Sequence, residues 1–369
     1  MKILVYFSGK LFESKGTPIR TRNMIEQLQK NGAEVYYAGY DVPTGMSNTH
    51  AVVLKSPLQR GFQLVKFVKE YGIEIVYFQT SAGLWFVPFV RLLTQAHVGV
   101  DFHSRRLQEE HVYQQRFSLH TFFLEQIELL FCRFLSFSTS VSETITQYYK
   151  NVVPLSLTLP VGVNTSLFTP HISPNEEIAQ WKGDALLIAY AGNTKWYQGL
   201  GTVLTAFEKL YKENPDSVKF LVIASSGIDD VRAYADKHDV AEGMYILDKQ
   251  SHESIPGLLA AADVLTVVRP SDMVTEFSFP SKLPEYAALG KALIVSRVSD
   301  IESYIKNGEN GVVVDPEDAE GVYTALQLLQ NPHTREKFGE SARLLAENTF
   351  DISVLGRKLF LFLNGIVGT

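Results

Sequence analysis

A serine, a lysine and a carboxylate stand close together at the predicted start of a short helix in the second half of the chain. Ser281 and Lys282 follow a proline, Glu285 falls in the first helical turn, and Gly290 ends the pattern before an apolar strand. The N–H groups of a helix N-terminus attract phosphates, and a carboxylate accepts hydrogen bonds from two hydroxyl groups. This combination suits the phosphates and ribose of a sugar nucleotide, so the segment predicts a binding site.

Alternating strand and helix patterns must position these residues. In the first half, β-rich runs predict strands at 2–7, 34–40, 74–78, 98–103, 135–141 and 152–159. In the second half, they predict strands at 185–191, 218–224, 263–268, 292–296 and 311–314. Repeated strand–helix units of this kind are typical of a doubly wound parallel sheet, so we expect an α/β fold.

The pattern starts afresh after residues 169–183, a polar segment with two prolines that predicts a linker. A chain of 369 residues is long enough for two domains with their own cores. We therefore expect a first domain at 1–170 and a second at 171–350. Residues 351–369 carry apolar side chains at helical spacing and predict a C-terminal helix.

Ligands of doubly wound sheets bind where the strands end at their carboxyl edge. The loops of interest are therefore 8–17, 103–106, 192–201, 248–251 and 269–281. In the first of them, Gly16 precedes a predicted helix start and either lets the backbone approach a ligand or forms an ordinary flexible turn.

Composition narrows the class of protein. The single cysteine, Cys132, excludes a disulfide within the chain and indicates a reducing compartment; its plainer interpretation is a buried apolar residue. No stretch of 18 apolar residues occurs, so we expect no membrane span and a cytoplasmic location.

Charge is divided unevenly along the chain. Residues 1–170 contain 16 Lys and Arg against 12 Asp and Glu, a net +4, whereas the remainder contains 18 against 28, a net −10. The positive half favours an anionic acceptor or peripheral contact with the anionic inner face of a membrane, unless these charges merely solvate helices. No basic run with interleaved aromatic residues occurs, so nucleic acid is not an expected partner.

Four segments, in order, resemble motifs of the GT-B retaining nucleotide-sugar glycosyltransferases of family 4 type. They are 161–168, 192–200, 279–295 and 307–311. The resemblance implies two Rossmann-like domains facing across a cleft, with the acceptor bound by the first and the donor by the second. It also implies a C-terminal helix that crosses back to the first domain. No D-x-D triad occurs, which is consistent with a reaction that needs no metal and no cofactor beyond a UDP- or GDP-sugar as co-substrate.

The resemblance also assigns roles to single residues. Glu285 matches a glutamate that holds the donor ribose, although a solvated first-turn acid remains the alternative. Glu276 lies nine residues earlier where the family has eight, with Phe277 at the strict position, so either the loop bulges or this carboxylate role is absent. His103 ends a strand where similar enzymes place a histidine near the transferred sugar, and a structural role is its alternative.

The glycine loop departs from the family pattern. Asn193 and Gln198 occupy the positions of its two basic residues, so the diphosphate charge must be met by Lys195, Lys282 or Arg269, each of which has a packing role as its alternative. The full prediction assigns catalytic roles to His103, Glu276 and Lys282, donor binding to Gly16, Gly192, Asn193, Lys195, Lys249, Ser281, Lys282, Leu283 and Glu285, and no metal ligand.

The resemblance implies transfer of a hexosyl unit, with retention of anomeric configuration, to a sugar, lipid-linked or other hydroxyl acceptor in polysaccharide, glycolipid or glycoconjugate synthesis. The leaving phosphate itself would help to deprotonate the acceptor. Two alternatives stay open. One is a catalytically silent binding or scaffold subunit, which Asn193 and Gln198 favour, and the other is a sugar-nucleotide epimerase of the same architecture.

Overall fold

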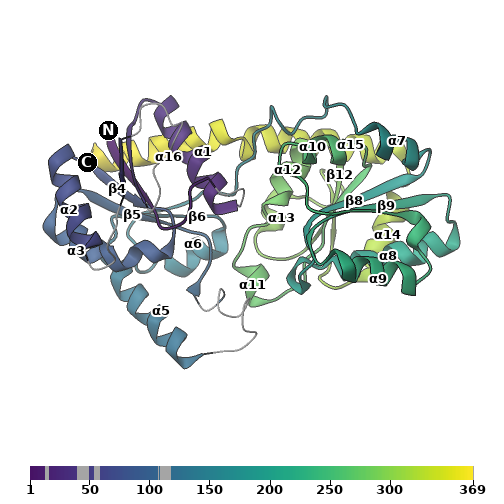
Figure 1. Cartoon of the computed structure of the whole chain (residues 1–369), viewed down its shortest axis with the longest axis horizontal. Helices are drawn as coiled ribbons and strands as arrows, with labels where there is room; N and C mark the ends of the chain where they lie inside the picture. Colours follow the sequence, from purple (N-terminus) through teal and green to yellow (C-terminus); the bar gives the residue numbers. More distant parts are fainter. Residues whose placement is uncertain (13–15, 40–49, 54–58, 107, 109–117, 369) are drawn as a thin grey trace. The chain divides into compact units, whose positions relative to one another are not determined.

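The computed structural model describes residues 1–12, 16–39, 50–53, 59–106, 108 and 118–368. The chain divides into two compact units, drawn in Figure 1. Unit 1 consists of Met1–Gly162, Phe277–Phe279 and Ile352–Thr369, and unit 2 of Val163–Glu276 and Pro280–Asp351. Each unit is an α/β structure around its own parallel sheet.

Unit 1 contains a seven-stranded sheet in the order β3-β2-β1-β4-β5-β6-β7, with every neighbouring pair parallel. Its strands are β1 Lys2–Phe7, β2 Glu34–Gly39, β3 His50–Val53, β4 Ile75–Phe78, β5 His97–Phe102, β6 Phe137–Ser140 and β7 Ser156–Thr158. Its helices are α1 Gly16–Lys30, α2 Arg60–Tyr71, η1 Ser81–Phe86, α3 Val87–Leu93, α5 Leu119–Cys132, α6 Glu143–Tyr149 and α16 Ile352–Val367.

Unit 2 repeats the same winding with six parallel strands in the order β10-β9-β8-β11-β12-β13. The strands are β8 Leu186–Asn193, β9 Val218–Ser226, β10 Met244–Leu247, β11 Val264–Val267, β12 Ala292–Ser296 and β13 Val312–Val314. The helices are α7 Glu176–Lys182, η2 Trp196–Gln198, α8 Leu200–Glu213, α9 Ile228–Lys237, η3 Ala241–Gly243, α10 Ile255–Ala260, α11 Met273–Glu276, α12 Lys282–Ala288, α13 Ile301–Tyr304, α14 Ala319–Leu328, α15 Pro332–Leu345 and η4 Ala346–Phe350.

The predicted α/β class with two doubly wound sheets is confirmed. Three local predictions differ from the structure. The strand expected at 152–159 is reduced to the three residues of β7, the segment expected to be a linker contains α7, and β3 and β10 were not predicted at all. The asparagine Asn175 explains the helix in the supposed linker, because its side chain caps α7 by accepting from the N–H of Ile178 at 3.0 Å.

Helix α16 returns to unit 1, as predicted, and lies beside α1 (Figure 1). The two helices approach closely at Gly356, where a Cβ would collide with the side chain of Gln27. The apolar stripe of α16 joins the same core as strand residues Ile3, Val5 and Tyr77, and consists of Leu355, Leu359, Leu363 and Ile366. None of the helices in the described part of the chain is both long and apolar enough to span a membrane.

A buried ion pair ties α1 to the sheet of unit 1. Arg20 donates from Nε to Asp101 Oδ2 at 2.8 Å, and its other nitrogens donate to the carbonyls of Leu159 and Pro160, each at 2.8 Å. Burial alone would raise the pKa of Asp101, but Arg20 and then His103 outweigh it and hold that pKa well below its ordinary value. Asp101 is therefore a permanent anion inside the unit.

Shortening a leucine of α16 tests its place in the core. We expect Leu359→Ala to lower the free energy of unfolding by about 2–5 kcal/mol, because Leu359 is fully buried and its loss leaves a cavity. Leu361→Ala is the matched control: 58% of Leu361 is exposed, so its cost should stay within about 0.5 kcal/mol. Calorimetric unfolding of both variants measures the difference, and equal costs would contradict the packing of α16 on unit 1.

Removing one member of the buried ion pair tests its energetic role. We expect Asp101→Asn to cost about 3–5 kcal/mol in unfolding free energy, because the buried charge of Arg20 loses its counterion. The double variant Arg20→Met with Asp101→Asn should cost clearly less than the sum of the two single changes. Additive costs in denaturant unfolding would show that the two groups do not stabilise each other.

Candidate functional site

Unit 1 places His103 directly after β5, at the carboxyl edge of its sheet. The ring Nε2 lies 2.6 Å from Asp101 Oδ2, and Nδ1 lies 3.2 Å from the hydroxyl of Thr17 in the first turn of α1. Both ring nitrogens are thus engaged within the unit, and Asp101 fixes the orientation of the ring. Contact of His103 with a substrate remains a prediction, and it would require a substrate group to replace Thr17.

In unit 2, the side chain of Tyr286 holds α12 to the end of β8. The hydroxyl of Tyr286 accepts a hydrogen bond from the N–H of Ala191 at 2.8 Å, and Tyr286 is fully buried. Gly192 follows with a φ of +148°, and a Cβ there would lie 2.5 Å from Cε of Lys282. Only glycine lets the lysine side chain lie across the end of the strand.

Lys282 is the centre of the polar contacts at this edge. Its Nζ donates to Gln198 Oε1 at 2.9 Å and lies 3.8 Å from the centroid of the Tyr190 ring. Burial lowers the pKa of Lys282 well below its ordinary value, the nearby guanidinium of Arg269 lowers it further, and Glu285 opposes both. Arg269 and Glu285 therefore act on the charge of Lys282 in opposite directions.

Arg269 supplies the second cation from the end of β11. Its side chain is buried, and its Nε donates to the carbonyl of Tyr197 at 3.4 Å. Burial lowers the pKa of Arg269 to about 10, so the guanidinium stays charged at neutral pH. Its backbone is anchored to Ser296 Oγ, which accepts from the Arg269 N–H at 2.7 Å.

Glu285 lies one turn into α12 and faces His252. The distance from Glu285 Oε1 to His252 Nδ1 is 3.9 Å, and 25% of the Glu285 side chain remains exposed. Burial raises the pKa of Glu285 to about 7, and Lys282 only partly counteracts this effect. The carboxyl can therefore change its charge state near neutral pH and is accessible to a ligand.

Glu276 ends α11 and has two partners. Its Oε1 accepts from Ser271 Oγ at 2.7 Å, and its Oε2 accepts from the Ser299 N–H at 2.8 Å. The carboxylate thus links the loop after β11 to the loop after β12. These contacts give Glu276 a positioning role. Its predicted catalytic role remains a proposal.

The remaining predicted residues occupy varied environments. Leu283 is fully buried and packs within the unit, so its side chain cannot contact a donor. Asn193 ends β8 and accepts from the N–H of Lys195 at 3.2 Å, while Lys249 is exposed in the loop after β10. Two others are exposed at helix starts, Ser281 before α12 and Gly16 at the first position of α1.

The structure adds residues that sequence reasoning missed. Asp101 contacts His103, and the signal was available because residues two apart on a strand point to the same side. His252 approaches Glu285 from the loop before α10, and no local pattern pairs residues so distant in the chain. Gln198 was noted as a departure from a motif, whereas in the structure it holds the ammonium of Lys282.

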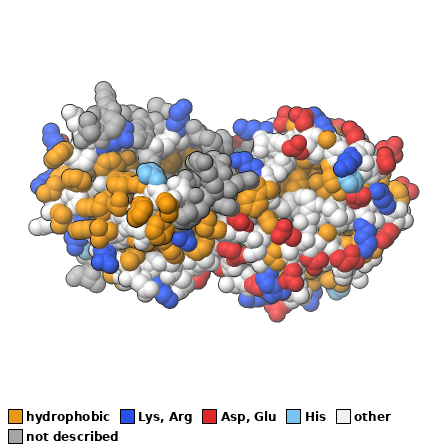
Figure 2. Space-filling view, turned by 90° about the horizontal axis from the view of Figure 1, so that it is seen from below, with side chains coloured by type: hydrophobic (Ala, Val, Ile, Leu, Met, Phe, Trp, Pro, Cys, Tyr) orange, Lys and Arg blue, Asp and Glu red, His pale blue; other side chains and the backbone are white. Residues whose placement is uncertain are grey.

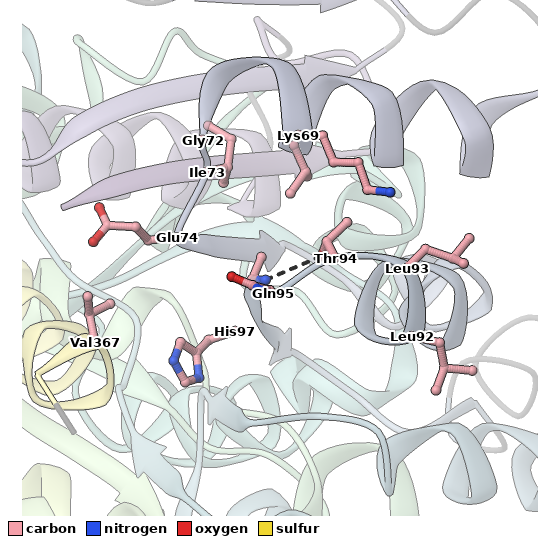
Figure 3. A pocket seen from close by; sticks show the side chains of 12 residues that line it. Lys69, Gly72, Ile73, Glu74, Leu92, Leu93, Thr94, Gln95, His97 and Val367 are labelled. Carbon is pink, nitrogen blue, oxygen red and sulfur yellow. Dashed lines mark hydrogen bonds between the residues drawn. The ribbon is translucent and has the colours of Figure 1, made fainter.

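A pocket of about 730 Å³ lies elsewhere in unit 1, at the amino ends of β4 and β5 (Figure 3). Its polar lining includes Lys69, Glu74 and His97. Ligands of doubly wound sheets bind at the opposite, carboxyl edge, so this pocket is not part of the candidate site. The convergence of Gln198, Arg269, Lys282 and Glu285 in unit 2 is the stronger candidate.

Part of the chain matches a known protein family. Residues 173–345 match the family described as "Glycosyl transferases group 1", and all four converging residues lie within that range. A D-inositol 3-phosphate glycosyltransferase of Corynebacterium diphtheriae is 26% identical over 213 residues, covering 54% of this chain and 48% of that protein. A GDP-mannose-dependent alpha-(1-6)-phosphatidylinositol monomannoside mannosyltransferase of Mycolicibacterium smegmatis is 23% identical over 213 residues, with 56% of each covered.

The match to these relatives therefore spans about half of their length. Comparison with solved structures shows a similar fold over the whole chain. Sucrose-phosphate synthase (tll1590) from Thermosynechococcus elongatus superposes with a TM-score of 0.80 at 17% identity, covering 100% of this chain and 99% of that one. Anabaena Alr3699/HepE in complex with UDP gives 0.78 at 13% identity, covering 99% and 100%. Residues 173–345 therefore match the glycosyl transferases group 1 family, and the chain as a whole shares the GT-B fold of these solved structures.

Proposed function

We propose that this protein transfers a hexosyl unit from a nucleotide diphosphate sugar to an acceptor hydroxyl, with retention of anomeric configuration. The observation that carries the proposal is that Lys282, held by Gln198, the buried Arg269 and the accessible carboxyl of Glu285 all lie at the carboxyl edge of the unit 2 sheet. Lys282 and Arg269 offer positive charge for a diphosphate. Glu285 offers a carboxyl that accepts hydrogen bonds from hydroxyl groups.

The cations act on the leaving group. A diphosphate that enters beside Lys282 adds negative charge, which raises the pKa of the lysine and favours its ammonium form. Charge then builds on the diphosphate as the sugar departs, and the ammonium stabilises this charge in the transition state. Arg269 provides a second, permanently charged group on the same side.

The carboxyl of Glu285 acts on the other end of the nucleotide. Once ionised, it accepts hydrogen bonds from both ribose hydroxyls, in an environment where such bonds are stronger than in water. His252 Nδ1 lies 3.9 Å from its Oε1. This arrangement needs no protein base at the reacting centre, since the departing phosphate can receive the proton of the acceptor.

The comparisons support a nucleotide-sugar donor. The Anabaena protein has been crystallised with UDP and with UDP-glucose, and the M. smegmatis relative is named for its dependence on GDP-mannose. Both UDP- and GDP-sugars are therefore donors to test. The relatives are named for D-inositol 3-phosphate and for phosphatidylinositol monomannoside. For this chain the proposal is a sugar, lipid-linked or other hydroxyl acceptor in polysaccharide, glycolipid or glycoconjugate synthesis.

A catalytically silent binding subunit is the second candidate, because the positions of two family cations hold Asn193 and Gln198 and because Lys282 is bound by Gln198. A screen of UDP- and GDP-sugars with detection of released nucleotide distinguishes the two. Release of nucleotide by the purified protein supports the transferase, whether the acceptor is a sugar or, with donor in excess, water. Binding of a nucleotide without any release supports the silent subunit.

Removing the charge of Glu285 tests ribose recognition. We expect Glu285→Gln to weaken binding of UDP or GDP by about tenfold or more, because charge-assisted hydrogen bonds contribute about 1.5–3 kcal/mol each. Calorimetry with the nucleotide and with its 2′-deoxy analogue measures the effect, and the variant should no longer distinguish the two ligands. Glu253→Gln, an exposed change in the loop that carries His252, is the control and should bind normally. Unchanged affinity of Glu285→Gln would remove this carboxyl from the site.

The same carboxyl predicts a pH dependence. Because the pKa of Glu285 is raised to about 7, the carboxyl is largely protonated at pH 6 and ionised at pH 8. Nucleoside binding should therefore strengthen as the pH rises through 7 and should be flat in Glu285→Gln. Uridine and guanosine serve as ligands because they carry no phosphate that titrates in this range.

Truncating Lys282 tests the role of the cation in the reaction. We expect Lys282→Ala to lower turnover by about 10²-fold, while uridine or guanosine affinity changes little, because the ammonium acts on charge that develops on the phosphates. Lys337→Ala on the exposed face of α15 is the control. If Lys282→Ala keeps full turnover and Lys195→Ala loses it, the phosphate role belongs to Lys195.

A further inference from the structure

Helix α5 in unit 1 has the reverse of an ordinary surface pattern. Its two carboxylates point inward: Glu125 and Glu128 are only 2% and 4% exposed. Arg105 donates to both oxygens of Glu125 at 3.1 Å, and Arg106 pairs with Glu128. The charged side of the helix is therefore fixed against the protein by two ion pairs.

Apolar side chains occupy the outer side of the same helix. Phe123 is 63% exposed and Leu130 is 52% exposed, whereas surface helices usually show polar residues there. The neighbouring elements η1 and α3, which contact α5, add further exposed apolar residues. Together they form what we name the α5 face: Trp85, Phe89, Leu92, Leu119, Phe122, Phe123, Ile127 and Leu130. Figure 2 shows apolar side chains gathered over unit 1 on this side.

The exposed Lys and Arg charges that the structure describes in η1 and α3, in α5 and directly after it, have no exposed acidic counterpart in these three elements. Arg91 on α3 and Arg133 directly after α5 are exposed, and none of the acidic residues that the structure describes in η1, α3 and α5 is exposed. Large exposed apolar patches mark binding surfaces for proteins or membranes. The cationic border selects an anionic partner, and it would repel its own copy across a symmetric dimer.

We propose that the α5 face docks onto the surface of an anionic lipid bilayer. The apolar side chains enter the boundary between headgroups and acyl chains, Trp85 lies at headgroup level, and Arg91 and Arg133 contact lipid phosphates. This docking does not depend on the proposed reaction, because it uses residues of unit 1 that are outside the donor site.

Vesicle flotation with the full chain tests the proposal. We expect the protein to bind vesicles of equal parts phosphatidylcholine and phosphatidylglycerol about tenfold or more tightly than vesicles of phosphatidylcholine alone. Salt should weaken the binding, since the Debye length falls from about 10 Å at 0.1 M to about 3 Å at 1 M. Absence of binding to both vesicle types would overturn the proposal, whatever the outcome of the donor screen.

Matched variants locate the surface. Phe123→Gln with Leu130→Gln should lower binding to the mixed vesicles by about tenfold or more, because it removes two exposed apolar groups. Leu344→Gln with Leu361→Gln, two leucines that are each 58% exposed on α15 and α16, should bind as the wild type does. Arg91→Gln with Arg133→Gln should lower the preference for the mixed vesicles. Equal binding by all variants would overturn the proposal.

Tryptophan fluorescence tests the docking of the wild-type protein. Brominated phospholipid in the mixed vesicles should quench the emission of Trp85, and Trp85→Phe should abolish this part of the quenching. Quenching that persists in Trp85→Phe would place a different surface on the bilayer. If the wild type is monomeric, a second copy does not occupy the α5 face. If the wild type is a dimer and Phe123→Gln with Leu130→Gln dissociates it, the face binds another copy, and the lipid proposal is overturned.

Discussion

The candidate site depends on the hydrogen bond by which Gln198 Oε1 holds Nζ of Lys282. Burial and the nearby guanidinium of Arg269 both lower the pKa of this lysine, and Glu285 opposes them. The amide oxygen of Gln198 can accept a hydrogen bond from the lysine in its charged or its neutral form. Binding of an anionic ligand at this site remains a proposal.

The position of these groups follows from the winding of the sheet. β8 and β11 are neighbours and parallel, so their ends bring Gly192 and Arg269 to the same edge, and the helix α12 enters from the loop that follows. Gly199 allows this closeness, because its φ of +67° and its lack of a Cβ let the start of α8 approach the backbone at Val268. Glycine thus permits backbone positions that a larger residue would exclude, and these positions place the side chains of the site.

Much of the unit 2 site could be predicted from sequence because it is local. Ser281, Lys282 and Glu285 lie in one short segment, and their helix and following strand appear where the pattern predicted them. The pairings could not be predicted in the same way. His252 and Glu285, or Gln198 and Lys282, meet only through the tertiary fold, and the engagement of both His103 nitrogens depends on Asp101 and Thr17.

The fold was predictable wherever strands are apolar and helices amphipathic, and the failures have physical reasons. β7 is short and half-buried, so the apolar run around it overstated its length. In α5, apolar residues occupy the outside and carboxylates the inside, the reverse of the amphipathic pattern from which a buried side is usually predicted. Only the ion pairs with Arg105 and Arg106 reveal which side faces the protein.

The route of the chain through α16 has a consequence for biosynthesis. The core of unit 1 includes Leu355, Leu359 and Leu363, which follow the whole of unit 2 in the sequence. The ribosome therefore synthesises most of unit 1 first. The apolar surface that α16 covers stays exposed until unit 2 and then α16 have been translated. Domains usually fold in order from the N-terminus, with exposed apolar surface as the main risk of aggregation. In this chain the first unit to be synthesised is the last to be completed.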